Sequence, residues 1–208
     1  MRDDREDVDA RAGAIADELA AASGFGGNEI AYRDGARHRR SVCRLDATPQ
    51  AGETLPLREG GCYLITGGAG KLGLAVARHL AQRSHACLLL SGRSPTPSAS
   101  LQRELDALGA LGARVLYHSA DSADADAVRA LVAVAQSAFG ALHGVIHCAG
   151  VARDRSILDL DDREFAEMLS PKADGLALLD RATADQPLDF FVCFSSVSAL
   201  LGDLGAGV

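Results

Sequence analysis

The chain has 208 residues, of which 48% are hydrophobic, so it can bury the core of one α/β domain together with a short appendage. Its formal net charge is -7, and its aromatic content is only 4%, with no tryptophan. A chain without a broad basic surface or stacking aromatic side chains is not expected to bind nucleic acid or an anionic membrane.

The five cysteines are scattered along the chain, and none forms a CxxC pair. An odd number of cysteines without a disulfide framework favours a reducing compartment, so we expect a cytoplasmic protein. The six histidines show no HExxH or comparable spacing, which predicts no metal site. The first residues are acidic, unlike a signal peptide, and no apolar run reaches about 18 residues, so no membrane segment is expected.

Residues 1–45 predict a short helix followed by a hairpin. Apolar residues recur at helical spacing over residues 3–23, and acids are concentrated at the start, where the helix dipole favours them. Residues 29–33 and 36–45 read as two strands joined by the tight turn Asp34-Gly35. The stretch 46–60 is rich in Pro, Gly and Thr and has no hydrophobic periodicity, so we expect a linker there.

Residues 61–208 predict an α/β domain. Short apolar runs alternate with amphipathic stretches, in the order 62–65, 72–82, 86–91, 100–111, 114–118, 123–139, 144–148, 162–184 and 189–194. Strands with few polar positions, separated by helices, imply a parallel sheet that is covered on both faces. We therefore expect a Rossmann-like, doubly wound sheet of five strands with four intervening helices.

A glycine-rich turn follows the first of these strands. It comprises Thr66, Gly67, Gly68, Ala69, Gly70, Lys71, Leu72 and Gly73. Glycines let the backbone turn sharply and approach a pyrophosphate, and the helix that follows offers free N–H groups at its N-terminus. Because the turn belongs to the first βαβ unit, nucleotide binding is favoured over a purely structural turn.

The second strand of this domain ends in Ser91-Gly92-Arg93-Ser94. An acid at this place would accept hydrogen bonds from the ribose 2′-OH of NAD, whereas Arg93, with Ser94 beside it, suits a 2′-phosphate. We therefore expect NADPH rather than NADH; the alternative is an arginine that covers a loop in solvent. Asp121 follows the third strand, where it can line the adenine edge, cap the next helix, or do both.

The fourth strand ends in His147-Cys148-Ala149-Gly150, at the carboxyl edge of the sheet. Ligands bind at this edge in open α/β folds, and small residues there let the backbone pass close to a cofactor. We expect these four residues to contribute to cofactor binding, and a buried strand end without a ligand is the alternative.

Taken together, these motifs and the Ser195-Ser196 pair resemble the short-chain dehydrogenase/reductase superfamily. More narrowly, residues 171–175 (PKADG) and 194–199 (FSSVSA) resemble the ketoreductase domain of modular polyketide synthases. The hairpin EIAYRDGARH and the segment LREGGCYLITGG are similar to the lead-in found in synthases of the trans-acyltransferase type. The resemblance implies that residues 1–45 are a remnant of the structural subdomain, 46–60 a linker, and 61–208 the NADP-binding ketoreductase domain.

The resemblance also implies roles for individual residues. The active Lys corresponds to Lys172, and the active Ser, which hydrogen-bonds the substrate carbonyl, corresponds to Ser196. In the family a proton-donating Tyr follows this Ser by about thirteen residues, one position beyond Val208, with an Asn about four residues later. We therefore expect a fragment whose sheet is incomplete at the C-terminus and which is inactive alone.

The implied reaction is the NADPH-dependent reduction of a β-ketoacyl group to β-hydroxyacyl. The implied partners are an acyl carrier protein, which holds the substrate on its phosphopantetheine arm, and other polyketide synthase domains. Two alternatives stand beside this hypothesis. One is a free-standing short-chain reductase of a small carbonyl compound, and the other is a non-catalytic nucleotide-binding half that pairs with a second chain.

The sequence departs from the family pattern at two places. Lys71 stands where the superfamily commonly has Gly, so either its stem bends away from the pyrophosphate or its charge joins phosphate binding. Asp154 is the one acid kept from the Leu-Asp-Asp motif of one stereochemical class, and Leu201 stands where the opposite class tends to have Trp. We expect these two positions to bear on stereocontrol, and they favour neither class.

Overall fold

The computed structural model describes residues 4–21, 30–34, 36–41, 43–44, 56–151 and 156–201. The chain divides into two compact units, residues 1–52 and residues 53–208.

The first unit contains helix α1 (Asp4–Ala21) and the antiparallel hairpin of β1 (Ile30–Arg33) and β2 (Ala36–Arg39). The second strand is shorter than the expected 36–45: within the described residues its pairing ends at Arg39, opposite Ile30, the first residue of β1. Glu18 of α1 accepts hydrogen bonds from the Tyr32 hydroxyl at 2.7 Å and from the Arg37 guanidinium. This ion pair joins the helix to the hairpin and holds the pKa of Glu18 down at about 2.

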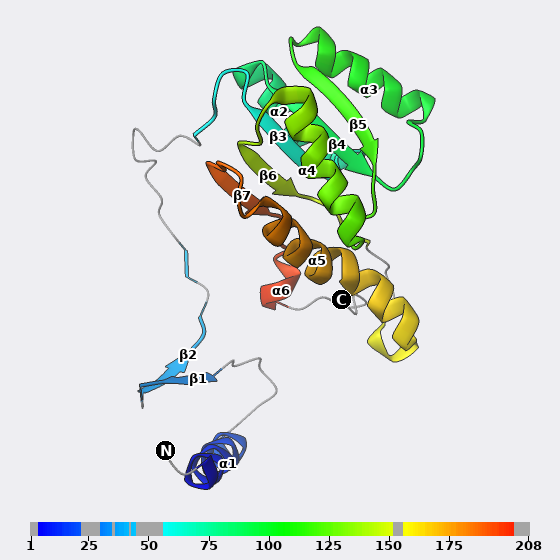
Figure 1. Ribbon diagram of the computed structural model, residues 1–208. Helices are drawn as coiled ribbons and strands as arrows, with labels where there is room; N and C mark the ends of the chain where they lie inside the picture. Colours follow the sequence, from blue (N-terminus) through cyan, green and yellow to red (C-terminus); the bar gives the residue numbers. More distant parts are fainter. Residues whose placement is uncertain are drawn as a thin grey trace. The chain divides into compact units, whose positions relative to one another are not determined.

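The second unit is built on a five-stranded parallel sheet in the order β5-β4-β3-β6-β7 (Figure 1). The strands are β3 (Cys62–Thr66), β4 (Cys87–Gly92), β5 (Arg114–Ser119), β6 (Gly144–His147) and β7 (Phe190–Cys193). The predicted doubly wound sheet is confirmed, because the chain builds outward from β3 to β5 and then returns to place β6 on the other side of β3.

Four long helices connect the strands, as expected: α2 (Lys71–Ser84), α3 (Ala99–Ala110), α4 (Ala125–Phe139) and α5 (Asp162–Thr183). A short 3-10 turn (Ile157–Asp159) and helix α6 (Ser198–Leu201) were not predicted. Helices α3, α4 and α5 start at the side chains of Ser98, Asp124 and Asp161, each of which accepts a hydrogen bond from a backbone N–H of the first turn. The cap of α4 is therefore Asp124, so of the two roles open to Asp121 the structure contradicts the capping one.

Two hydrophobic clusters hold the helices against opposite faces of the sheet. Alternate strand residues face each cluster, which is why the strands read as continuous apolar runs. One cluster joins α4 and α5 to the sheet through residues that include Leu64, Leu89, Leu131, Val145 and Leu179. The other joins α2 and α3 to it through residues that include Ile65, Ala77, Leu80, Leu90 and Leu108.

Strand β7 forms one edge of the sheet and is only half-buried. On the α2 face, an apolar hollow of about 350 Å³ lies beside it, lined by residues that include Phe190, Val192 and Phe194. Among the described residues, no strand pairs with the outer edge of β7. The sheet is thus open on this side within the described part of the chain.

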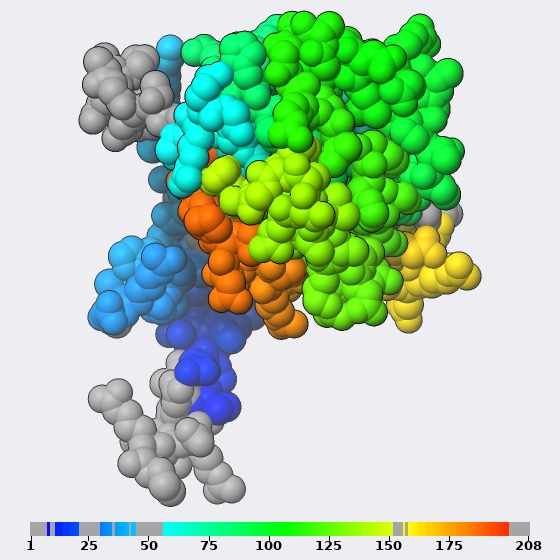
Figure 2. Space-filling model, turned by 45° about the horizontal axis from the view of Figure 1, so that its top comes forward, coloured from blue at the N-terminus to red at the C-terminus, as the bar shows by residue number. Residues whose placement is uncertain are grey.

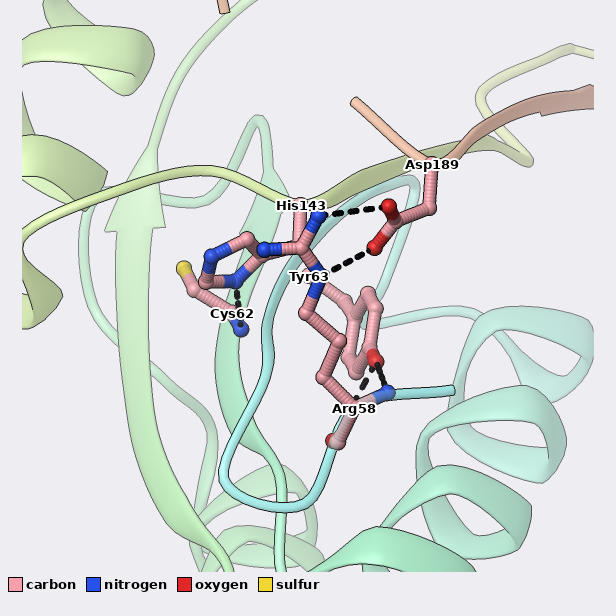
Figure 3. A network of polar contacts seen from close by, with 5 residues as sticks. All are labelled: Arg58, Cys62, Tyr63, His143 and Asp189. Atoms are coloured by element: carbon pink, nitrogen blue, oxygen red, sulfur yellow. Dashed lines mark hydrogen bonds and ion pairs between the residues drawn. The ribbon is translucent and has the colours of Figure 1, made fainter. Parts of the chain in front are cut away.

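A polar network closes the amino end of the sheet (Figure 3). Arg58, in the segment before β3, donates two hydrogen bonds to the Asp189 carboxylate, at 2.5 and 2.6 Å. The Tyr63 hydroxyl accepts from the Arg58 backbone N–H at 2.8 Å, and His143 Nδ1 accepts from the Cys62 N–H at 3.0 Å. Figure 2 shows the resulting proximity, with the segment before β3 (cyan) beside the start of β7 (orange).

The Arg58–Asp189 pair should contribute stability that depends on pH. Arg58 lowers the pKa of Asp189 below its ordinary value of 3.8, so the contribution is present at neutral pH and is lost as the pH falls through the folded-state pKa. We expect Asp189→Asn to lower the thermal unfolding temperature at pH 7 and to have a smaller effect as the pH is lowered, because the wild-type carboxyl then becomes protonated as well.

The matched control is Glu104→Gln, which removes a pair with Arg78 in which both side chains are about half-exposed, at 51% and 41%. Such exposed pairs contribute little, so this variant should unfold at the wild-type temperature. If Asp189→Asn behaves like Glu104→Gln at pH 7, the Arg58 contact does not stabilise the domain.

Candidate active site

A cavity of about 340 Å³ lies at the carboxyl ends of the strands. Its wall is built from the loops after β3, β4, β5 and β6 and from one side of α5. The lining residues are Gly67, Ser91, Gly92, Arg93, Ala120, Asp121, Ser122, Ala123, Ala149, Gly150, Val151, Glu167, Ser170 and Pro171. The cavity spans the position where the strand order reverses between β3 and β6, which is where open α/β sheets bind ligands.

The turn after β3 can meet the turn after β6 only because residue 67 is glycine. Gly67 adopts a φ of +66°, and a Cβ atom there would lie 2.8 Å from the Cα of Ala149. Gly73, in the first turn of α2, is equally confined, since its Cβ would lie 2.6 Å from the Gly67 carbonyl oxygen. The glycines therefore let the first turn of α2 pack directly on the loop that precedes it.

The N-terminus of α2 differs from those of the other long helices of this unit. Its N-cap is Gly70, which has no capping side chain, and its first turn holds no acid. Backbone N–H groups at such an end are available to an anion, and the helix dipole favours negative charge there. Lys71 opens the helix and is exposed, as expected if its stem bends away from the turn.

Strand β5 holds the loop that carries Arg93. The Tyr117 hydroxyl donates to the Ser94 carbonyl at 2.8 Å, and the Ser119 hydroxyl donates to the Arg93 carbonyl at 3.3 Å. Burial raises the pKa of Tyr117, which keeps its hydroxyl protonated as a donor. The Arg93 side chain is exposed at the cavity, on a backbone that β5 fixes in place.

Two carboxylates face the same cavity as Arg93. Asp121 accepts a hydrogen bond from the Ala123 N–H at 3.0 Å, which shapes the loop after β5 rather than the start of α4. Glu167 reaches the cavity from α5 and accepts a hydrogen bond from Arg163 at 3.0 Å. Helix α5 can approach this loop because Gly175 has no side chain, and a Cβ there would lie 3.1 Å from the Ser122 carbonyl oxygen.

The His147 side chain is buried and does not line the cavity. It is 5% exposed, with Nδ1 2.7 Å from the Thr66 hydroxyl and Nε2 2.9 Å from the Pro171 carbonyl oxygen. Neither His147 nor Cys148 lines the cavity, whereas the next two residues, Ala149 and Gly150, do. Within this motif, the cavity is therefore lined by the two small residues.

Lys172 lies close to the cavity on α5. It follows Pro171, which lines the cavity, and its Cε lies 3.7 Å from the position that a Cβ on Gly150 would take. Ser196 lies three residues beyond β7; its hydroxyl donates to Ser198 Oγ at 3.0 Å and accepts from the Ser198 N–H at 3.1 Å. Ser196 is exposed and does not line the cavity.

The cavity thus brings together five of the expected residues, which are Gly67, Arg93, Asp121, Ala149 and Gly150. The other residues of the glycine-rich turn do not line it. Asp154 lies outside the described residues, and Leu201 ends α6 in a position whose side chain is not described.

Sequence reasoning missed the α5 wall of the cavity, formed by Glu167, Ser170 and Pro171. These residues share one face of the helix at i, i+3 and i+4 spacing. These three residues could have been predicted from the sequence, because Pro171 directly precedes Lys172, which was already expected to belong to the site.

Within the described part of the chain, no cluster of three or more His, Cys, Asp or Glu residues could hold a metal ion. None of the helices described combines the length and apolar character needed to span a bilayer.

The packing at Gly73 generates a prediction with an internal control. In Gly73→Ala the new Cβ would collide with backbone atoms of Gly67 and Gly68, both 2.6 to 3.1 Å away, so the turn must shift. Gly109, at the end of α3, has nothing within 4 Å of its Cβ position, and alanine there favours the helix by up to about 1 kcal/mol. Thermal unfolding should show Gly73→Ala less stable than the wild type and Gly109→Ala as stable or more so. Equal stability of the two variants would show that the turn is not tightly packed.

Comparison with known proteins places this site in a family. Residues 61–208 match the family of KR domains. The chain is 43% identical over 152 residues to polyketide synthase PksL of Bacillus subtilis, which covers 73% of this chain and 3% of PksL. It is 37% identical over 190 residues to polyketide synthase ThaG of Burkholderia thailandensis, which covers 91% of this chain and 3% of ThaG.

Solved structures agree with these relatives. A ketoreductase domain from the bacillaene assembly line matches with a TM-score of 0.76 at 42% identity, over 86% of this chain and 42% of that chain. An A-type ketoreductase from a modular polyketide synthase has the same TM-score, at 34% identity, over 86% of this chain and 37% of that one. The chain therefore spans less than half of these solved proteins and a small fraction of the curated relatives. With more than half of its length matched, the chain belongs to the ketoreductase domains of polyketide synthases, within the short-chain dehydrogenase/reductase superfamily.

Proposed function

We propose that this domain reduces a β-ketoacyl group to β-hydroxyacyl with NADPH. The observation that carries the proposal is the cavity at the β3–β6 reversal, which has a glycine-lined turn on one side and Arg93 on the other. A nicotinamide cofactor follows from the family, whereas the preference for NADPH rests on the residue that follows β4.

The residues present fit a dinucleotide. A side chain at Gly67 or Gly68 would collide with backbone atoms less than 3 Å away, so glycine is needed for the turn to pack beside the cavity, which Gly67 lines. The uncapped N-terminus of α2 offers N–H groups for the pyrophosphate. Arg93 supplies a fork of donors for a 2′-phosphate, and Asp121 and Ser122 line the wall where the adenosine half would lie.

When bound, the reduced nicotinamide supplies a hydride to the carbonyl carbon. In the proposed reaction Ser196 donates a hydrogen bond to the carbonyl oxygen, where negative charge develops. The Lys172 ammonium lowers the pKa of the proton donor, which protonates the resulting alkoxide. The expected donor is a tyrosine about thirteen residues after Ser196.

The tyrosines of the described residues are engaged elsewhere. Tyr32 bonds Glu18 in the first unit, Tyr63 bonds the backbone of Arg58 at the amino end of the sheet, and Tyr117 bonds the Ser94 carbonyl. None of these tyrosines lines the cavity, so none of the three hydroxyls is placed to protonate a substrate bound there.

The proposed substrate is carried on the phosphopantetheine arm of an acyl carrier protein. The curated relatives support this proposal, because they are polyketide synthases of which the matched segment is 3%. In such an assembly the other synthase domains deliver the substrate and accept the product.

Cofactor choice should depend on Arg93. We expect wild-type protein to bind NADPH roughly ten- to a hundredfold more tightly than NADH, since a charge-assisted phosphate contact contributes about 1.5–3 kcal/mol. Arg93→Ala should abolish most of this difference by weakening NADPH binding alone. Fluorescence titration with each cofactor measures the two dissociation constants. The control is Arg103→Ala, which changes an exposed arginine of α3 outside the cavity. Equal wild-type affinities for the two cofactors would contradict the proposed specificity.

Turnover should depend on Lys172 and Ser196. In the full-length protein, Lys172→Ala and Ser196→Ala should each lower kcat by roughly 10²–10⁴ while leaving the Kd of NADPH nearly unchanged. The assay measures the reduction of a β-ketoacyl thioester, carrier-bound or free, as the rate at which NADPH is consumed. Ser195→Ala is the matched control, because it alters the neighbouring exposed serine and should keep near wild-type turnover.

The carrier-bound thioester should be the better substrate, and residues 1–208 alone should show no turnover. A normal rate from these residues alone would contradict the proposal that a later tyrosine donates the proton. A preference for free small carbonyl compounds would favour a free-standing type of reductase instead.

A further inference from the structure

His147 connects two segments of the site that are far apart in sequence. Its Nδ1 lies 2.7 Å from the hydroxyl of Thr66, and its Nε2 lies 2.9 Å from the carbonyl oxygen of Pro171. The first partner is the last residue of β3, and the second belongs to α5. One buried side chain on β6 therefore bonds both to the end of β3 and to helix α5.

The two partners define the state of the imidazole. A carbonyl oxygen can only accept, so Nε2 carries the hydrogen and donates it to Pro171. In the neutral ring Nδ1 then accepts from the Thr66 hydroxyl. Burial lowers the pKa of His147, which favours this neutral form. Each polar group of the set has a partner, as do all buried side-chain nitrogen and oxygen atoms in the described part of the chain.

Each partner stands next to a residue with a role in the proposed site. Thr66 precedes Gly67, where the turn begins with a φ of +66°. Pro171 lines the cavity and precedes Lys172. Both bonds therefore act within one residue of the groups that hold cofactor and promote proton transfer.

Helix α5 contains a proline at this place. Pro171 has no N–H, so one internal hydrogen bond of the helix is missing beside the cavity. The His147 bond to the Pro171 carbonyl attaches the helix to the end of β6 at this proline.

We propose that His147 is a positioning residue that sets the distance between the phosphate-binding turn and the helix that carries Lys172. The inference rests on the proposed function and deepens it. His147 does not line the cavity; it acts through Thr66 on the turn and through Pro171 on Lys172.

Three substitutions in the full-length protein separate the two bonds. His147→Phe fills the space and removes both. In the His147→Gln variant, the side-chain amide nitrogen can still donate to the Pro171 carbonyl. In the His147→Asn variant, the shorter side-chain amide can reach only the Thr66 hydroxyl. NADPH affinity, kcat for a β-ketoacyl thioester and thermal unfolding are measured for each.

We expect His147→Phe to lower kcat roughly tenfold or more, because small displacements of a reacting group are costly. We also expect it to weaken NADPH binding by roughly three- to tenfold, the effect of one lost hydrogen bond. His147→Gln should recover most of kcat, whereas His147→Asn should recover NADPH affinity but not kcat. The control is His143→Phe, which removes a hydrogen bond to the Cys62 N–H at the opposite end of the same strand and should lower only the unfolding temperature.

If His147→Phe and His143→Phe lower the unfolding temperature alike and leave kcat and Kd unchanged, His147 is a structural residue and the inference is overturned. If His147→Phe does not fold, Thr66→Val decides, because it removes one hydroxyl at nearly constant shape. A Thr66→Val variant with wild-type NADPH affinity also overturns the inference. Wild-type protein that neither binds NADPH nor reduces the thioester would instead contradict the proposed function itself.

Discussion

The close approach of two backbone turns is the constraint on which the rest of the site depends. The turn after β3 meets the turn after β6 with no space for a side chain at Gly67, where a Cβ would lie 2.8 Å from Ala149. This contact occurs where the strand order reverses, so it closes the base of the cavity. The loops after β4 and β5 then extend the wall outward to Arg93 and Asp121.

The two ends of the sheet are organised in different ways. At the amino end, the Arg58 guanidinium donates to Asp189, the Arg58 backbone N–H donates to the Tyr63 hydroxyl, and His143 accepts from the N–H of the first residue of β3 (Figure 3). At the carboxyl end, α2 begins without a side-chain cap, although α3, α4 and α5 are each capped by their own sequence. Backbone donors are therefore left available at the place where the family binds the phosphates of its cofactor.

Sequence periodicity was sufficient to predict the strands of the sheet and the helices between them. Strands buried on both faces read as continuous apolar runs, whereas amphipathic helices repeat their apolar residues every three to four positions. Periodicity could not choose between Asp121 and Asp124 as the cap of α4, since both are suitable residues three positions apart and only the backbone path decides. Periodicity also could not predict whether the His147 side chain lines the cavity or is buried beside it, because both kinds of strand end have the same local sequence. The α5 wall at Glu167 was missed because it depends on how a distant helix crosses the loops.

The central claim is that the cavity at the β3–β6 reversal holds NADPH with its 2′-phosphate at Arg93. The most direct test is a crystal structure of the protein with NADP⁺ bound. We expect the pyrophosphate against the Gly67–Gly70 turn and the N-terminus of α2, with the 2′-phosphate hydrogen-bonded to the Arg93 guanidinium. A 2′-phosphate bound by Lys71 instead, or an adenosine half that lies outside this cavity, would contradict the claim.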